Sequence, residues 1–146
     1  MWQAHTLGVL TEHRAGTYVY GDRNTLLSGA MNLNDCAFSV LTTVVSRPTQ
    51  DRAILDGGSK TFSSDLASQE GYGLLPDYPR SVFYKLTEEH GMVNVSNCEN
   101  PPQIGERLRV IPNHCCVVSN LFDKVAVVRG EKVEMFWAIT ARGKLQ

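Results

Sequence analysis

Short runs of β-branched and aromatic residues, each closed by glycine or proline, dominate this sequence of 146 residues. The longest run covers residues 36–46 and stops before Pro48, and a shorter one covers residues 53–55 and is closed by residues 56–58. Branched and aromatic side chains pack well on a pleated surface, whereas glycine and proline interrupt strand pairing. The pattern therefore predicts a chain made mostly of strands.

Five further segments have the same character: residues 18–20, 82–87, 108–111, 124–128 and 132–140. The last two are expected to form a hairpin that turns at Arg129-Gly130. Residues 66–79 hold two glycines and two prolines and are expected to form a loop, and Asn113 is expected to cap a short helix over residues 114–120. About eight short strands predict a mainly β fold. We expect an antiparallel β-barrel-like single domain over residues 1–146, with one or two short helices.

The composition argues against several classes of partner. The net charge is −1, and the 14 basic and 15 acidic residues are spread along the chain, so neither nucleic acid nor an anionic membrane is an expected partner. No apolar stretch approaches the roughly 20 residues of a membrane-spanning helix. Residues 1–10 lack the pattern of a signal peptide, and the four cysteines form no C-x-x-C pair. These features predict a cytoplasmic protein with reduced thiols.

His114 and Cys116 form the most informative local cluster. Two residues apart, their side chains share one face of an extended backbone, whereas on a helix they diverge by roughly 200°. An imidazole and a thiolate suit zinc. Two ligands are too few for a closed structural site, so they would form an open site that water or a substrate completes. The alternative is a core cysteine beside a hydrogen-bonded histidine.

Glu88, Glu89 and His90, followed by Gly91, form a second cluster. Adjacent carboxylates beside a histidine can shift each other's pKa values and orient a ligand or a water molecule. The alternative is a solvated strand end. The glycine-rich residues 56–60 end in a lysine but lack the spacing of a phosphate-binding loop, so they are read as a turn.

Several segments, taken in order, resemble one particular domain. They are residues 14–22, 43–48, 55–60, 63–65, 86–91 and 104–114, followed by Cys116, Trp137 and residues 141–143. The pattern Pro-Asn-His-x-Cys, together with Glu-Glu-His-Gly, is the most specific part. Over residues 8–143 the chain resembles the C-terminal domain of the D-serine dehydratase and D-threonine aldolase family, which has the alanine racemase fold type.

The resemblance implies an enzyme context. Members of that family are pyridoxal-phosphate enzymes, usually dimers, in which an N-terminal barrel carries the Schiff-base lysine and the C-terminal β domain brings a divalent metal to the substrate. The zinc ligands of the dehydratases correspond to His114 and Cys116. Aldolases tend to have aspartate at the second position, so Cys116 favours the dehydratase-like version. The metal would polarise the substrate hydroxyl as a Lewis acid. Around the metal, or facing a substrate, we expect Glu88, Glu89, His90, Tyr18 and Asn113.

No barrel sequence accompanies this domain, so we expect no covalently bound pyridoxal phosphate and no catalysis by this chain alone. It would bind zinc or another divalent metal and a small amino or hydroxy acid, or it would complete an enzyme with a separate barrel subunit. The alternative is a structural remnant or interaction module without metal. The face that the barrel covers in the family would be exposed, which predicts a homo-oligomer. If the metal site exists, the imidazole of His114 and the sulfur of Cys116 lie roughly 3–4 Å apart.

Overall fold

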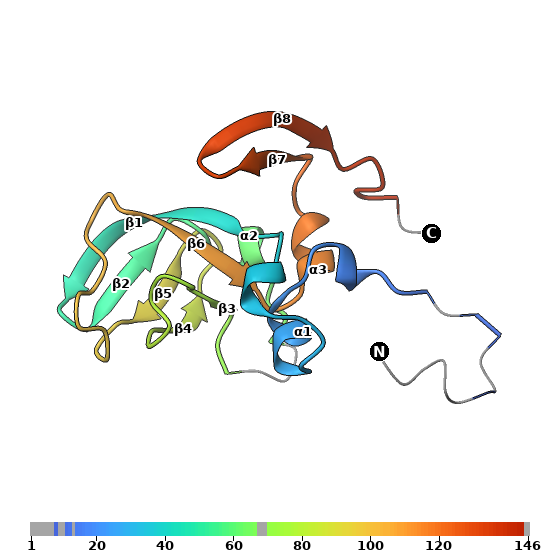
Figure 1. Cartoon of the computed structure of the whole chain (residues 1–146). Coiled ribbons are helices and arrows are strands. Elements are labelled where there is room, and N and C mark those ends of the chain that lie inside the picture. Colours follow the sequence, from blue (N-terminus) through green and yellow to red (C-terminus); the bar gives the residue numbers. More distant parts are fainter. Residues whose placement is uncertain (1–7, 9–10, 13, 67–69, 145–146) are drawn as a thin grey trace.

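A computed structural model describes residues 8, 11–12, 14–66 and 70–144. Its main body is a six-stranded antiparallel sheet of order β3-β6-β1-β2-β5-β4, which curls into a barrel-like shape, and a separate two-stranded hairpin, β7-β8, extends beside it (Figure 1). The strands are β1 (Val40–Thr49), β2 (Arg52–Leu55), β3 (Gly73–Leu74), β4 (Val82–Leu86), β5 (Gly91–Asn94), β6 (Arg107–Pro112), β7 (Lys124–Arg129) and β8 (Lys132–Ala138). The predicted mainly β, antiparallel and barrel-like fold is confirmed.

The helices are short. They are α1 (Arg23–Leu27), α2 (Ser59–Phe62) and α3 (Cys115–Ser119), with the 3-10 turns η2 (Thr17–Val19) and η3 (Leu33–Asp35). The described part of the chain thus has three α-helices, where the sequence predicted one or two. None of them is long and apolar enough to cross a membrane.

Alternating burial explains how the sheet forms its core. In β1, Val40, Thr42 and Val44 are buried while Leu41 and Val45 are exposed. This alternation places every second side chain of a strand on the inner face. Within this core, the ring of Phe83 is 1% exposed and meets the ring of Phe62 edge-on, with the ring centroids 5.2 Å apart.

The predicted bounds of β1 were wrong at both ends. Residues 36–39 are not strand, and the strand continues through Pro48 to Thr49. Strand β6 pairs with β1 only from Val40 to Thr43, so Pro48 lies where β1 has a single neighbouring strand, β2. The missing N–H of proline is tolerated at such a position.

Other differences from the prediction arise around glycines. Residues 18–20 were expected to be a strand, but Thr17–Val19 form a 3-10 turn, and Gly21 then reverses the chain with a positive φ of 70°. Residues 66–79 were expected to be a loop, yet Gly73–Leu74 pair with β6. A side chain at position 73 would come within 2.6 Å of Val110, so this pairing requires glycine.

Candidate metal centre

The two predicted metal ligands lie at the junction of β6 and α3. His114 has an extended backbone (φ −140°, ψ 102°) and precedes the first residue of α3, so the chain changes direction between His114 and Cys116. The prediction that Asn113 caps this helix was wrong, because His114 occupies the cap position and gives no side-chain cap. The imidazole is therefore free of a capping role and can bond elsewhere.

A buried carboxylate fixes the start of α3 instead. Asp22, which is fully buried, accepts a hydrogen bond from the backbone N–H of Cys115 at 3.1 Å. The same side chain caps α1 by accepting from the backbone N–H of Thr25 at 2.9 Å, and the Thr25 hydroxyl accepts from the Asp22 N–H at 2.8 Å. A carboxylate at two helix N-termini satisfies their unpaired N–H groups and suits both helix dipoles. Asp22 thus positions His114 and Cys116 without touching either side chain.

Asn113 connects the end of β6 to the segment that carries Asp65. It is 2% exposed, and its Nδ2 donates to the carbonyl oxygens of Gly71 at 2.7 Å and Asp65 at 3.2 Å. Its Oδ1 accepts from Arg23 at 3.2 Å, and Arg23 also donates to the carbonyl of Glu70 at 2.6 Å. Burial lowers the pKa of Arg23 from its ordinary value, and the nearby Glu70 opposes that shift. Asn113 is thus a buried anchor for Asp65 and Gly71.

His114 has a carboxylate partner that the sequence alone did not indicate as a site residue. Its Nδ1 lies 3.1 Å from Oδ2 of Asp65, and both side chains are about one-third exposed. With Nδ1–H donated to the carboxylate, Nε2 keeps its lone pair and is available to a metal. Asp65 belongs to the segment 63–65 of the family resemblance, but it lies 49 positions from His114, so spacing could not pair them.

The adjacent cysteines have opposite environments. Cys116 is exposed, and its sulfur lies 3.6 Å from the hydroxyl of Thr17 in η2, which places the exposed Tyr18 one residue from that contact. Cys115 is fully buried, and burial first, then the charge of Asp22, raises the pKa of its thiol well above the ordinary value. Only Cys116 of the pair is accessible as a ligand.

The acidic cluster forms the tip of the β4–β5 hairpin. Lys60 at the start of α2 contacts Glu89 at 2.5 Å and Glu88 at 3.1 Å, and these two hydrogen bonds raise the pKa of Lys60. His90 is exposed, and its backbone bonds to Thr87. Helix α2 in turn packs against α3. It therefore links the hairpin tip to the junction of β6 and α3 that carries His114 and Cys116, which we call the His114 corner.

A complete set of protein ligands is not assembled. Within the described ranges, no three His, Cys, Asp or Glu side chains lie close enough to hold one ion. The carboxylate of Glu89, expected as a third ligand or a neighbour of the metal, is bound to Lys60. The shared-ion geometry of His114 and Cys116 and the role of Glu89 and His90 therefore stay predictions.

Comparisons with known proteins agree with this fold. The model of the family described as "Putative serine dehydratase domain" matches residues 37–128. The chain belongs to that family. It is 42% identical over 131 residues to the uncharacterized protein Rv1414 of Mycobacterium tuberculosis, covering 85% of this chain and 97% of that protein.

Larger relatives contain the domain as one part. D-threonine aldolase of Arthrobacter sp is 35% identical over 139 residues, which are 93% of this chain and 35% of the aldolase. The structure of D-threo-3-hydroxyaspartate dehydratase from Delftia sp. HT23 superposes with a TM-score of 0.74 at 29% identity, over 88% of this chain and 38% of that one. The chain thus spans little more than a third of these enzymes. Two further structures of this dehydratase are a histidine-to-alanine mutant and a cysteine-to-alanine mutant in the metal-free form, at positions two residues apart in that enzyme.

Proposed function

We propose that this domain binds one divalent metal ion, zinc in the first instance, through Nε2 of His114 and the sulfur of Cys116. It would serve as the metal-binding part of a lyase for hydroxylated D-amino acids. The observation that carries the proposal is the hydrogen bond between His114 and Asp65. A carboxylate on the far nitrogen is the usual partner of a metal-ligating histidine, because it fixes the tautomer and raises the basicity of the free nitrogen.

The donor chemistry fits zinc in an open site. A neutral imidazole and a thiolate are both good zinc ligands, and two protein ligands leave places for water and for a substrate oxygen. The histidine and cysteine mutants of the Delftia dehydratase have the same two-residue spacing as His114 and Cys116, which supports the assignment. A bound metal would supply Lewis-acid polarisation of a substrate hydroxyl.

The chain's own residues would prepare that site. Asp65 holds His114 with its Nε2 available, Asn113 holds the segment of Asp65, and Asp22 holds the first turn of α3. A small amino or hydroxy acid is the ligand we propose for the open positions. Carbanion chemistry needs an electron sink, so turnover would require pyridoxal phosphate on a barrel domain.

Titration of zinc into metal-free protein at neutral pH is expected to show one site, and His114→Ala or Cys116→Ala is expected to weaken it at least about 100-fold. Asp65→Asn should weaken zinc about 10- to 100-fold, because it removes the carboxylate that orients the imidazole. Affinity should also fall as the pH is lowered, since both ligands must lose protons to bind. Isothermal titration calorimetry measures these constants.

Cys98→Ala is the matched control for the zinc titration, because Cys98 is a half-buried thiol outside this corner. If wild-type protein takes up no zinc at millimolar concentration, or if both ligand variants bind as tightly as wild type, the metal proposal is wrong. The remnant interpretation would then stand.

A second function, assembly, is favoured by the β7-β8 hairpin. Val125 pairs with Trp137 and Val127 with Met135, so these four apolar side chains share one face. Trp137 and Met135 are 54% and 51% exposed. No ladder joins the hairpin to the six-stranded sheet (Figure 1), and a two-stranded hairpin is only marginally stable in isolation. Val125 on this face is half-buried and packs against the core, so the exposed part formed by Met135 and Trp137 is the candidate interface.

We propose that a second copy of the chain covers this face, giving a homodimer. Charged side chains of the hairpin interact on its other face. There, the ammonium group of Lys124 lies 5.0 Å from the centre of the Phe136 ring, and Arg129 forms an ion pair with Glu134 at 2.8 Å. With a net charge of −1, two copies approach with little repulsion. A barrel subunit that docked on the same face would compete with the homodimer.

Trp137→Asp is expected to convert the dimer to a monomer, with a dissociation constant at least about 30-fold higher, because a buried tryptophan is a typical interface hot spot. Light scattering across a range of micromolar protein concentrations measures the mass. Ile104→Asp is the control, since Ile104 is 65% exposed but lies in the β5–β6 connection of the main sheet. A monomeric wild type at high concentration contradicts the proposal.

A further inference from the structure

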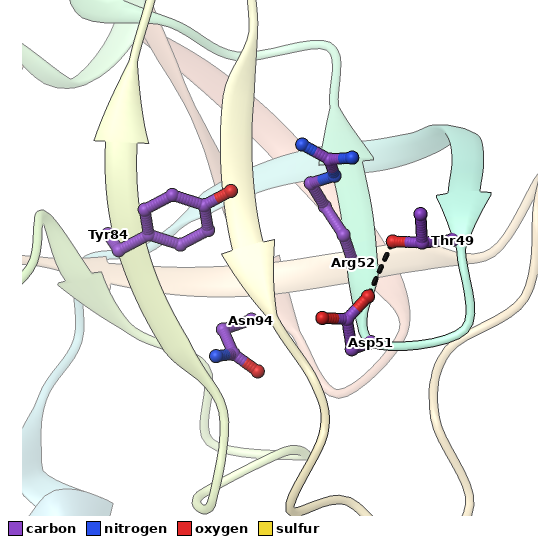
Figure 2. A pocket seen from close by; sticks show the side chains of 5 residues that line it. All are labelled: Thr49, Asp51, Arg52, Tyr84 and Asn94. Atoms are coloured by element: carbon purple, nitrogen blue, oxygen red, sulfur yellow. Dashed lines mark hydrogen bonds between the residues drawn. The ribbon is translucent and has the colours of Figure 1, made fainter.

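A hollow of about 240 Å³ lies against the six-stranded sheet at the end away from α3, beside the turn between β1 and β2 (Figures 1 and 2). Its walls come from that turn and from the two strands β5 and β4. The lining residues are Thr49, Asp51, Arg52, Tyr84 and Asn94. Arg52 and Asn94 are direct partners in the β2–β5 ladder, so the sheet itself holds them side by side.

Among the described residues, nothing pairs with the guanidinium of Arg52. The alternation of β2 buries Ala53 and leaves Arg52 on the outer face, with its Nε buried and without a hydrogen bond. In the part of the chain that the structure describes, no ion pair or hydrogen bond is made by its guanidinium. Buried polar atoms without partners are uncommon in folded proteins, and a guanidinium is suited to bidentate binding of a carboxylate.

Arg47, from the same hairpin, shows the opposite pattern. Its guanidinium donates to the carbonyl oxygens of Arg52 at 3.1 Å, Pro102 at 2.5 Å and Gln50 at 2.5 Å. These bonds fix the turn, so Arg47 has a structural role. The same hairpin therefore contains two arginines of different kinds. The guanidinium of Arg47 is hydrogen-bonded within the fold, whereas that of Arg52 is left for a ligand.

Asp51 places an opposite charge beside the same hollow. Its Oδ1 accepts a hydrogen bond from the hydroxyl of Thr49 at 2.5 Å. This bond, then a hydrogen bond from the backbone of Asp51 itself and the charges of Arg52 and Arg47, keeps the pKa of the carboxyl below its usual value. Asp51 is therefore ionised at neutral pH. Figure 2 shows its second oxygen turned away from Thr49, and no ion pair with Arg52 is found among the described side chains. Both charges of the turn are open to a ligand.

Neutral groups complete the walls. The Oδ1 of Asn94 accepts from the backbone N–H of Ser96 at 2.9 Å, which leaves its amide N–H groups as donors. Tyr84 is 42% exposed, and Figure 2 shows its ring on the side of the hollow opposite Asp51 and Arg52. The hollow thus offers a cation, an anion, an amide donor and an aromatic wall.

We propose that this hollow binds a small free α-amino acid as a zwitterion. Arg52 and the amide of Asn94 would hold its carboxylate, Asp51 would hold its ammonium group, and Tyr84 would contact its side chain. A simple anion would be repelled by Asp51, and a simple amine by Arg52, whereas a zwitterion satisfies both. The volume is below the roughly 300–1,000 Å³ of drug-sized sites, which limits the ligand to a few heavy atoms. The site is separate from the His114 corner and does not depend on a metal.

The test is an NMR titration of the full chain, labelled with ¹⁵N, at constant ionic strength. The ligands are glycine and two half-ligands that each carry one of its charges, acetate and methylamine. Glycine should cause saturable shifts at the backbone amides of residues 49–52, 84 and 94. Each half-ligand should bind at least about tenfold more weakly, because it leaves one charge unpaired. Equal binding of acetate and glycine, or no saturable shift with glycine, would overturn the proposal.

Variants test the roles of Arg52 and Asp51 one at a time. Arg52→Gln and Asp51→Asn should each lower glycine affinity at least about tenfold. Asp51→Asn should not weaken acetate binding, an outcome that a distorted turn would not give. The control Arg107→Gln removes an exposed arginine of β6 and should leave glycine binding unchanged. Loss of glycine binding in Arg107→Gln, or its retention in both hollow variants, would contradict the assignment.

Discussion

Replacing Asp22 by alanine is expected to lower the free energy of unfolding by about 3–4 kcal/mol, since it removes a helix cap and leaves buried N–H groups without a partner. The carboxylate is fully buried and accepts hydrogen bonds from the backbone N–H groups of Thr25 and Cys115. Alanine can offer neither bond. Because water cannot reach these groups, the loss is larger than that of an exposed cap.

Urea denaturation of the two proteins measures this difference directly. Asp77→Ala is the control, because the ion pair of Asp77 with Arg109 at 3.5 Å is exposed, and such pairs contribute about 0–1 kcal/mol. Zinc affinity is a second readout, since a displaced α3 separates Cys116 from His114 although Asp22 touches neither side chain. A loss below about 1 kcal/mol for Asp22→Ala would show that the corner relaxes and finds other acceptors.

Strands in which branched and aromatic residues recur at a regular spacing could be predicted from the sequence. Residues 82–87 and 108–111 have branched or aromatic residues at a spacing that needs no knowledge of the rest of the chain, and they correspond to β4 and β6. The predicted hairpin over residues 124–140 corresponds to β7 and β8 for the same reason. Local periodicity was sufficient in these cases.

Short strands that begin with glycine were not predictable in this way. Strand β3 has two residues, and β5 begins at Gly91, where a side chain would lie 2.4 Å from the ring of Phe83. Glycine usually indicates a turn, so the sequence pattern argued against a strand. Only the packing of the core explains why glycine is required there, and that packing is not a local property.

The candidate site was predictable only in part, for a similar reason. The spacing of His114 and Cys116 is local, so the sequence alone marks both residues as candidate ligands, and their role stays a prediction. The partner of His114 is Asp65, and the carboxylate that accepts the first N–H of α3 belongs to Asp22, 93 positions before Cys115. The pattern of Asp22 followed by Thr25 is a recognisable helix start, but nothing in the sequence indicates that the same carboxylate reaches a second helix.

Gly58→Ala is expected to destabilise the fold by about 3 kcal/mol, and the first cause is steric overlap. The φ of Gly58 is −113°, which any residue can adopt, so backbone strain is not the cause. A methyl group there would lie 2.4 Å from the carbonyl oxygen of Thr87 and 2.5 Å from that of Glu88. These are backbone atoms of the β4–β5 tip, and they cannot move aside without moving the hairpin.

The same two carbonyls hold α2 in place, and this makes the effect of Gly58→Ala larger than a local clash. They accept hydrogen bonds from the N–H groups of Ser59 at 2.8 Å and Lys60 at 3.1 Å. Displacing the tip would break these bonds and draw Glu89 away from Lys60, so the raised pKa of Lys60 should fall toward its ordinary value. Urea denaturation and an NMR titration of Lys60 measure the two effects.

Gly16→Ala is the matched control, because its φ of −123° is similar and a Cβ there meets no atom within 4 Å. Equal stability of the two variants would mean that the β4–β5 tip is free to move away from α2, and the acidic cluster would then not be held near the His114 corner.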